Sequence, residues 1–456
     1  MNDRPRASAA GADLRCIVMG AAGRDFHDIQ TFFRTHPSFH VVAITASQIP
    51  FIASRAFPRE LAGPSYDHDI PIHDESELPR LVTEHRADFV FLSYSDLSHL
   101  EVMHRAAIVQ AAGASFALLG PRHTQLRSQR PVVAVTASRT GAGKSPITQH
   151  LAAHLRDRGR RVGVLRHPMP YGELRAQVVQ RFATPEDLDR HRCTIEEREE
   201  YAPYVAMGMP IFAGVDYAAV LAAAEAEADV ILWDGGNNDT PFLVPDLWIT
   251  VVDALRPGHE LAYHPGETNL RAADVVVISK VARARAEDVQ SIESRVRAIS
   301  PRATVVHADL EVRAEPAGQI AGKRVLVVED GPTVTHGGMA YGAGSIAAQR
   351  EGAAELIDPR PFALGTVADA FTSYPHLGAV LPALGYSEIQ RRELAETIVR
   401  CAPELVVDGS PAGVVELLGL SLPCVRARYA FRHVAGPSLG ALVDGRLAEL
   451  ARRTGA

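Results

Sequence analysis

A glycine-rich segment at residues 138–145 carries the residue types that bind a polyphosphate. It reads Ser-Arg-Thr-Gly-Ala-Gly-Lys-Ser and follows an apolar run at 131–136. Glycines let backbone N–H groups face phosphate oxygens, a lysine reaches the β and γ phosphates, and a hydroxyl can ligate Mg²⁺. Ser138 stands where this motif has its first glycine, so a chance glycine-rich turn is the alternative. The residues predicted to bind the nucleotide are Thr140, Gly141, Ala142, Gly143, Lys144 and Ser145.

A carboxylate ends another apolar run, where a metal-side acid is expected. Asp234 follows residues 228–233 and precedes the polar loop 235–239. We predict that Ser145 and Asp234 hold Mg²⁺, with Asp234 acting directly or through water. The alternative is an Asp234 that caps the following turn. The loop has no apolar side chain that must be buried in a core. We therefore predict that it contacts the substrate through Asn237, Asn238 and Asp239.

Lysine is rare in this chain, which draws attention to its positions. It occurs only at residues 144, 280 and 323. Lys280 follows the apolar run 274–278 in the order Ser-Lys-Val-Ala, which resembles a guanine-specificity box without its aspartate. The missing carboxylate favours ATP over GTP. Lys280 either lays its stem on the purine ring or is a solvated surface lysine.

A second cationic site is predicted after the apolar run 161–165. Arg166 and His167 come next in the sequence, beside prolines that fix the loop. A forked guanidinium matches the oxygens of phosphate or carboxylate, so both residues are predicted to bind substrate. Arg181 is a weaker candidate in the charged span 173–200, which is expected to be a helical insertion or lid. Its acidic run offers the alternative of a solvated helix laced with ion pairs.

Three further stretches hold weaker candidates for the same cleft. Arg256 and His259 follow an apolar run, and the glycine-rich stretch 330–344 fits either an anion-binding nest or a mobile loop. The turn at 20–25 lacks one glycine of a dinucleotide fingerprint and has no acidic residue about 20 positions later, which excludes a nicotinamide cofactor. Arg24 and His27 are predicted to bind substrate, and plain surface residues are the alternative.

Alternating apolar runs and helical stretches must position these residues, and they predict an α/β protein. Residues 1–127 are expected to form a Rossmann-like open-sheet domain, and 128–322 a P-loop NTPase core of three layers with a parallel sheet. Residues 323–456 continue the alternation, either as a separate domain or as further strands of the core sheet. The predicted strands lie at 14–19, 41–44, 89–92, 116–119, 131–136, 161–165, 229–233, 247–252, 275–278, 304–306, 324–328, 355–357, 404–407 and 424–426.

Composition limits the class of partner. The 456 residues are 46% hydrophobic and carry a net charge of −7, so no overall positive field exists to hold a nucleic acid. Four cysteines with no CxxC pair argue against a disulfide framework or a zinc ribbon. No stretch reaches the roughly 18 apolar residues of a membrane span, and the expected location is the cytoplasm.

Long ordered strings of the chain resemble the cyclic 2,3-diphosphoglycerate synthetases, a P-loop family often labelled as GTPases. The resemblance runs over nearly the whole chain. It is carried by residues 19–27, 93–99, 140–145, 166–172, 233–239, 257–261 and 328–333.

The resemblance implies an ATP-dependent ligase. The family closes 2,3-bisphosphoglycerate into an intramolecular phosphoanhydride after γ-phosphoryl activation, and a homologue can keep that chemistry for a related small anionic substrate. Catalysis would fall to Lys144, Asp234, Arg166 and His167, with ATP and Mg²⁺ as cofactors. A homodimer is expected only by analogy with related P-loop proteins. The alternative function is a regulatory or metallochaperone-like NTPase switch that acts on a protein partner.

Overall fold

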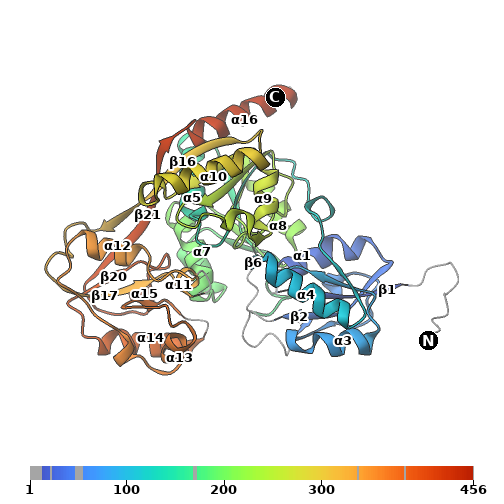
Figure 1. The fold of residues 1–456 in the computed structure, drawn as a ribbon, viewed down its shortest axis with the longest axis horizontal. Coiled ribbons are helices and arrows are strands. Elements are labelled where there is room, and N and C mark those ends of the chain that lie inside the picture. Colours follow the sequence, from blue (N-terminus) through green and yellow to red (C-terminus); the bar gives the residue numbers. More distant parts are fainter. Residues whose placement is uncertain are drawn as a thin grey trace.

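The computed structural model describes residues 13–20, 23–46, 55–167, 172–335, 338–384 and 387–454. In Figure 1 an N-terminal lobe, in blue, and a C-terminal lobe, in orange, lie on opposite sides of a central lobe. We use N-terminal lobe for residues 13–127 and C-terminal lobe for residues 324–423. The predicted α/β class with a P-loop core is confirmed by the sheet topology.

The N-terminal lobe is built on a six-stranded sheet with the order β3-β4-β2-β1-β5-β7. Neighbouring strands are parallel except for β3 and β4. Residues of β1 alternate between two cores, with Val18 on one face and Ile17 on the other, because successive strand residues point to opposite sides. Its strands are β1 (Leu14–Met19), β2 (Phe39–Ala46), β3 (Ala56–Phe57), β4 (Ile70–Asp74), β5 (Phe89–Leu92) and β7 (Ser115–Ala117).

One helix of this lobe begins at a capping box that its sequence supplies. Helix α4 starts after Ser98, whose hydroxyl accepts the Glu101 N–H at 3.2 Å while the Glu101 carboxylate accepts the Ser98 N–H at 2.7 Å. Short β6 (Leu97–Ser98) pairs with β14 (Tyr263–His264), which ties the N-terminal lobe to the central lobe. The helices are α1 (Arg24–Thr31), α2 (Arg59–Ala62), α3 (Leu78–His85) and α4 (His99–Ala111).

A thirteen-stranded sheet runs through the central and C-terminal lobes in the order β10-β11-β9-β12-β8-β13-β15-β16-β21-β20-β17-β18, with β19 on β17. Its pairs are parallel except β10 with β11 and β16 with β21. The strands are β8 (Val132–Ala137), β9 (Val162–Leu165), β10 (Gln180–Phe182), β11 (Ile211–Ala213), β12 (Val230–Trp233), β13 (Leu247–Asp253), β15 (Val275–Ser279), β16 (Thr304–Glu315), β17 (Arg324–Glu329), β18 (Glu355–Leu356), β19 (Leu381–Pro382), β20 (Leu405–Asp408) and β21 (Cys424–Ala435).

Helices cover both faces of this sheet and make the three layers. Val133 and Val135 of β8 belong to the core under α5, whereas Val132 and Ala134 belong to the core under α8. Strands buried on both faces read as continuous apolar runs, which explains why they could be predicted. The helices are α5 (Lys144–Asp157), α6 (Pro185–Arg190), α7 (Ile195–Ala206), α8 (Tyr217–Glu227), α9 (Gly266–Ala272), α10 (Ala286–Ile299), α11 (Gly331–Val334), α12 (Ala343–Arg350), α13 (Gly365–Ser373), α14 (Glu388–Arg400), α15 (Val414–Leu417) and α16 (Leu439–Thr454).

Two strands are much longer than their predicted lengths. β16 and β21 each have 12 residues, where apolar runs had indicated three, and they pair antiparallel from His307 to Glu315. Outside those runs, polar and apolar residues mix along the strands because one side of the pair is partly exposed. The ribbon connects the central lobe to the C-terminal lobe, whose strands therefore share the sheet of the P-loop (Figure 1).

The charged span 173–200 is only partly the expected helical insertion. It contains β10 and α6, and α7 begins at Ile195. The alternative of a solvated helix is wrong, because Glu196, Glu197 and Glu199 of the acidic run are buried. Helix α7 instead forms an inner wall of the molecule.

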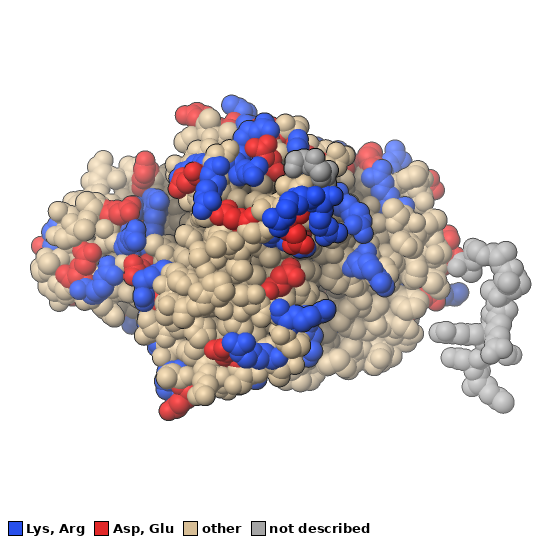
Figure 2. Space-filling view, turned by 90° about the horizontal axis from the view of Figure 1, so that it is seen from above, with Lys and Arg blue, Asp and Glu red and all other residues tan. Residues whose placement is uncertain are grey.

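The outer surface agrees with the balanced composition. Acidic and basic side chains are interspersed over the face seen in Figure 2, with uncharged areas between them. Among the described residues, no helix is both long and apolar enough to cross a membrane.

Candidate active site

The glycine-rich loop links β8 to α5, as the sequence predicts. Gly141 and Gly143 have φ angles of +78° and +101°, in the left-handed region that favours glycine. A Cβ on Gly143 would lie 2.6 Å from Cδ1 of Leu310 on β16, so this position also has no space for a side chain. Ser138 is buried in the loop and donates its N–H to the Val251 carbonyl at 2.9 Å. The loop closes without the first glycine of the motif.

Two cations brace the outside of this loop. Lys280 Nζ donates to the Gly141 carbonyl at 2.6 Å, and Arg256 Nη2 donates to the Thr140 carbonyl at 2.7 Å. Both also pair with Oδ2 of Asp253 at 2.8 Å. The alternative of a solvated surface Lys280 is therefore wrong, since its side chain is buried against the loop. These contacts hold the loop in shape before any phosphate arrives.

Lys144, Arg166 and Asp234 form a buried cluster at the inner end of the loop. Lys144 Nζ lies 2.8 Å from Asp234 Oδ1, and Arg166 Nη1 lies 2.8 Å from Asp234 Oδ2. The Tyr204 hydroxyl donates to Asp234 Oδ2 at 2.6 Å, and Arg166 also pairs with Glu200. The parallel strands β9 and β12 end side by side, which is why residues 68 positions apart meet.

The charges of this cluster set its proton affinities. Burial and then the nearby Arg166 lower the pKa of Lys144 to about 8, although Asp234 opposes them. Burial alone would raise the pKa of Asp234, but the positive charges of Lys144 and Arg166 outweigh that effect and lower it. Asp234 therefore stays ionised and shares its charge between two cations.

The predicted Mg²⁺ site fits these residues only in part. The Ser145 side chain lines the pocket and fits a metal-ligand role. Both carboxylate oxygens of Asp234 are instead occupied by Lys144, Arg166 and Tyr204. No group of three or more acidic, histidine or cysteine side chains suited to a metal occurs in the described part of the chain. Asp234 as arranged does not present a free oxygen to Mg²⁺.

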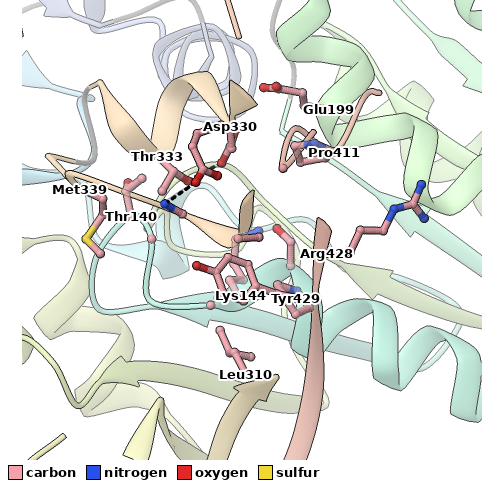
Figure 3. A pocket seen from close by; sticks show the side chains of 18 of the residues that line it. Thr140, Lys144, Glu199, Leu310, Asp330, Thr333, Met339, Pro411, Arg428 and Tyr429 are labelled. Atoms are coloured by element: carbon pink, nitrogen blue, oxygen red, sulfur yellow. Dashed lines mark hydrogen bonds between the residues drawn. The ribbon is translucent and has the colours of Figure 1, made fainter. Parts of the chain in front are cut away.

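A pocket of about 240 Å³ opens between the loop and the C-terminal lobe. Lys144 and Leu310 lie on one side of it in Figure 3, and Glu199, Asp330 and Thr333 on the other. Glu199 comes from α7, whereas Asp330 and Thr333 follow the end of β17. The carboxyl ends of the two halves of the sheet thus face a common space, where ligands of open α/β sheets bind.

The C-terminal side of the pocket is stiffened by a buried acid. Glu329 accepts hydrogen bonds from the N–H groups of Gly342 at 2.9 Å, Gly344 at 3.1 Å and Ser345 at 2.7 Å. These are the first free amides of α12, whose dipole favours a negative charge. The glycine-rich stretch therefore binds an anion from its own chain, and its residues 336 and 337 lie outside the described part.

His167 and Asp239 form a second pair beside the loop. His167 Nδ1 lies 2.8 Å from Asp239 Oδ2. Burial would raise the pKa of Asp239, but His167 and Arg24 lower it to about 2. The pair lies at the contact between lobes, since a Cβ on Gly23 would lie 2.0 Å from His167 Nε2.

Arg24 and His27 lie at the same contact, away from the pocket lining. Arg24 Nη1 donates to the Thr240 carbonyl at 3.0 Å, and His27 Nε2 lies 2.7 Å from the Thr124 carbonyl oxygen. The His27 ring stacks on Phe242 with centroids 4.0 Å apart. Burial lowers the pKa of His27 to about 3, so the ring is neutral in this position. Both side chains join the N-terminal lobe to the central lobe.

A relative found by sequence comparison covers almost the whole chain. The protein named arginine synthetase ArcE, from Thermococcus kodakarensis, is 53% identical over 430 residues, which are 94% of this chain and 96% of that protein. The chain belongs to the arginine synthetase ArcE family. It is therefore an enzyme of the synthetase, or ligase, type with a P-loop nucleotide-binding fold.

The similarity to cyclic 2,3-diphosphoglycerate synthetases covers a smaller part of the chain than the sequence analysis predicts. The synthetase of that name from Thermococcus gammatolerans is 31% identical over 121 residues, or 26% of this chain and 27% of that protein. No protein-family model matches the chain. Among solved structures, ATP-bound LpxK from Aquifex aeolicus is 12% identical, with a TM-score of 0.43 over 76% of this chain and 95% of its own. HypB from Archaeoglobus fulgidus is 14% identical, with a TM-score of 0.26 over 51% and 90%.

In this ArcE family member, the predicted site residues divide into groups. Residues that line the pocket include Thr140, Gly141, Gly143, Lys144, Ser145, Arg166, Asn237 and Lys280. Residues in a shell around it include Ala142, Asp234, Asn238, Asp239, Arg256 and His259, and Asn238 Nδ2 donates to the Ser138 carbonyl at 3.2 Å. Arg181 is not brought to the pocket: it lies on edge strand β10 and pairs with Glu227 at 2.7 Å. Residues 168–171, also part of the predicted cationic loop, lie outside the described part.

Several pocket residues of the ArcE family member were not predicted to act. Glu199 and Glu200 were assigned to a charged insertion, and Tyr429 belongs to a strand that was predicted too short. Asp330 was noted only within a glycine-rich loop and within one string of the family resemblance, with no role assigned to it. A usable signal was the pair of acidic residues Glu329 and Asp330 directly after the apolar run 324–328, since Asp234 likewise follows an apolar run.

Proposed function

We propose that this enzyme is an ATP-dependent synthetase that makes arginine by transferring the γ-phosphoryl group of ATP to an oxygen of a small precursor. One observation carries the proposal: a single pocket joins a phosphate-binding loop to a wall of acidic side chains. The loop supports binding of ATP, and the acidic wall suits a product with a positive charge. The ArcE relative, by its name, supplies the identity of that product.

The chemistry of arginine restricts the precursor. The arginine side chain has no oxygen, so an oxygen that accepts phosphate must leave during the reaction. A ureido group, as in citrulline, has such an oxygen on the carbon that becomes the guanidino carbon. Attack of this oxygen on the γ-phosphorus releases ADP, and ammonia then displaces phosphate from the carbon to give arginine. This is the phosphoryl activation that the family resemblance implies, applied to another substrate.

The described residues have distinct tasks in this proposal. The loop amides and Lys144 bind the phosphates, which requires Lys144 to exchange its contact with Asp234 for a phosphate oxygen. Arg166 stays fixed between Asp234 and Glu200 and presents its positive charge to the transferred group. Lys280 and Arg256 keep the loop rigid from outside. When Mg²⁺ is bound with ATP it neutralises phosphate charge, and no step here depends on a metal contact with Asp234.

The second candidate product is cyclic 2,3-diphosphoglycerate, which the 31% identical relative favours. Such a substrate carries two phosphates and needs several free cations. The predicted arginines do not supply them: Arg166 is paired with Asp234, Arg256 with Asp253 and Arg181 with Glu227. The facing acids would repel this substrate, which is why arginine is the preferred product.

The test is turnover of the purified enzyme with Mg-ATP. Citrulline plus ammonium is supplied in one reaction and 2,3-bisphosphoglycerate in another, with ³¹P NMR and amino-acid analysis of the products. We expect ADP, phosphate and arginine in equal amounts from the first reaction alone. A cyclic phosphoanhydride resonance in the second would support the second candidate. A rate of ATP turnover that is the same with and without either substrate would contradict both candidate products. It would favour a switch that acts on a protein partner.

A further inference from the structure

The pocket contains a buried carboxyl group that has no positively charged partner among the described residues. Glu199 is 5% exposed and lines the pocket from α7. Neither of its oxygens accepts a hydrogen bond from an N–H group among the described residues. A buried carboxylate is costly unless a cation or hydrogen-bond donors compensate it. A ligand with a positive charge and hydrogen-bond donors would therefore be stabilised next to Glu199.

The groups that face Glu199 add negative charge. They are Asp330 of the loop after β17, Asp408 at the end of β20 and Glu196 of the same helix. Burial and then the neighbouring Asp330 raise the pKa of Glu199 well above its usual value. Burial also raises the pKa of Asp330, although its hydroxyl partner Thr333 and the more distant Arg166 oppose this. The ligand-free pair is expected to hold a proton that a bound cation would displace.

Three cations of the pocket are engaged elsewhere. Lys144 contacts Asp234, Lys280 contacts Asp253, and Arg166 is held between Asp234 and Glu200. Arg428 lines the pocket, but in Figure 3 its guanidinium points away from Glu199 and Asp330. The missing positive charge must then come from a ligand.

The shape of the missing cation follows from the donors that two carboxyl groups accept. A guanidinium is planar and has five N–H donors in a fork, so it can serve two carboxylates at once. Arg166 does so in the same pocket, where it bridges Asp234 and Glu200. A resident metal is less suited, since the described residues include no set of three metal-binding side chains.

We infer that Glu199 and Asp330 bind the guanidinium group of arginine, on the opposite side of the pocket from Lys144. The inference rests on the proposed function and adds the groups that distinguish arginine from its ureido precursor. Citrulline is neutral at the same position and gains less from the pair. As the guanidinium forms, its positive charge develops against these two carboxyl groups.

Isothermal titration calorimetry of arginine into the enzyme saturated with Mg-ADP tests this inference. In the wild type, we expect binding to release about one proton, seen as a dependence of the heat on the buffer. Glu199→Gln keeps the shape of the side chain and should weaken arginine binding about 10-fold or more. Its citrulline affinity should change by less than about 3-fold. Asp330→Asn, on a separate element, should behave similarly.

Controls separate loss of the site from loss of the fold. Affinity for Mg-ADP reports an intact P-loop in each variant, and Glu396→Gln on the exposed face of α14 should leave the affinity for arginine unchanged. If the wild type binds Mg-ADP but not arginine, the proposed product is wrong and this inference fails with it. If arginine binds the wild type without proton release, or binds both variants as tightly as the wild type, the guanidinium site is overturned while the proposed function stands.

Discussion

Asp234 and Glu199 are buried acids of one pocket, and they differ in what surrounds them. Asp234 contacts Lys144, Arg166 and Tyr204, whereas the groups facing Glu199 are other acids. Their pKa values are shifted in opposite directions. The first acid is satisfied by its own chain and the second is not, so the difference separates a preassembled part of the site from a part that a ligand completes.

Removing the cation on the preassembled side should have the largest effect on turnover. Lys144→Ala takes away a charge that contacts Asp234 in the free enzyme and, by our proposal, phosphate in the complex. We expect turnover, measured as phosphate release, to fall by about 10²–10³-fold. Lys323→Ala, at the residue directly before β17, should have little effect. Equal loss in both variants would contradict a special role for Lys144.

Removing the acid itself should cost stability. Asp234→Asn leaves Lys144 and Arg166 buried beside each other without their shared counter-charge. We expect a loss of about 3–5 kcal/mol in unfolding free energy near neutral pH, measured by denaturant unfolding. Asp229→Asn breaks a largely exposed pair with Arg161 and should cost about 0–1 kcal/mol. Similar losses at the two positions would show that the buried cluster around Asp234 stabilises the fold no more than an exposed ion pair does.

The smallest expected effect is on the pH dependence of stability. Because the folded-state pKa of Glu199 is raised, its favourable contribution is complete below its unfolded pKa and is lost as pH rises. Glu199→Gln should remove this decline, so its Tm should exceed that of the ligand-free wild type by on the order of 2–4 °C at the upper end of pH 5–8. Asp234 has the opposite sign, because its lowered pKa gives stability that is lost as pH falls. Parallel pH profiles for the wild type and Glu199→Gln would contradict the account of Glu199.

The predictable parts of the site were those fixed by neighbours in the sequence. The phosphate-binding loop and the carboxylate after β12 could be found because both follow apolar runs that become buried parallel strands. Their meeting also follows from the sheet, since β8 and β12 are adjacent.

The acidic side of the pocket could not be predicted, because it depends on contacts between residues that are far apart in the sequence. The acidic run of α7 has the composition of a solvated helix, and only its packing between lobes buries Glu199. The same limit applies to Arg181, whose charge gave no sign that Glu227 would hold it at an outer edge. The lengths of β16 and β21 were predicted too short, because a strand with one partly exposed side has no continuous apolar run.

The paired strands β16 and β21 run along the pocket and connect its two sides. Leu310 and Tyr429 touch the pocket from these strands, and nine residue pairs join the strands from His307 to Glu315. The phosphate-binding loop after β8 and Asp330 after β17 are therefore carried by one continuous sheet, whereas Glu199 comes from α7. The spacing between the loop after β8 and the loop after β17 is therefore set by the backbone pairing of the strands that lie between them.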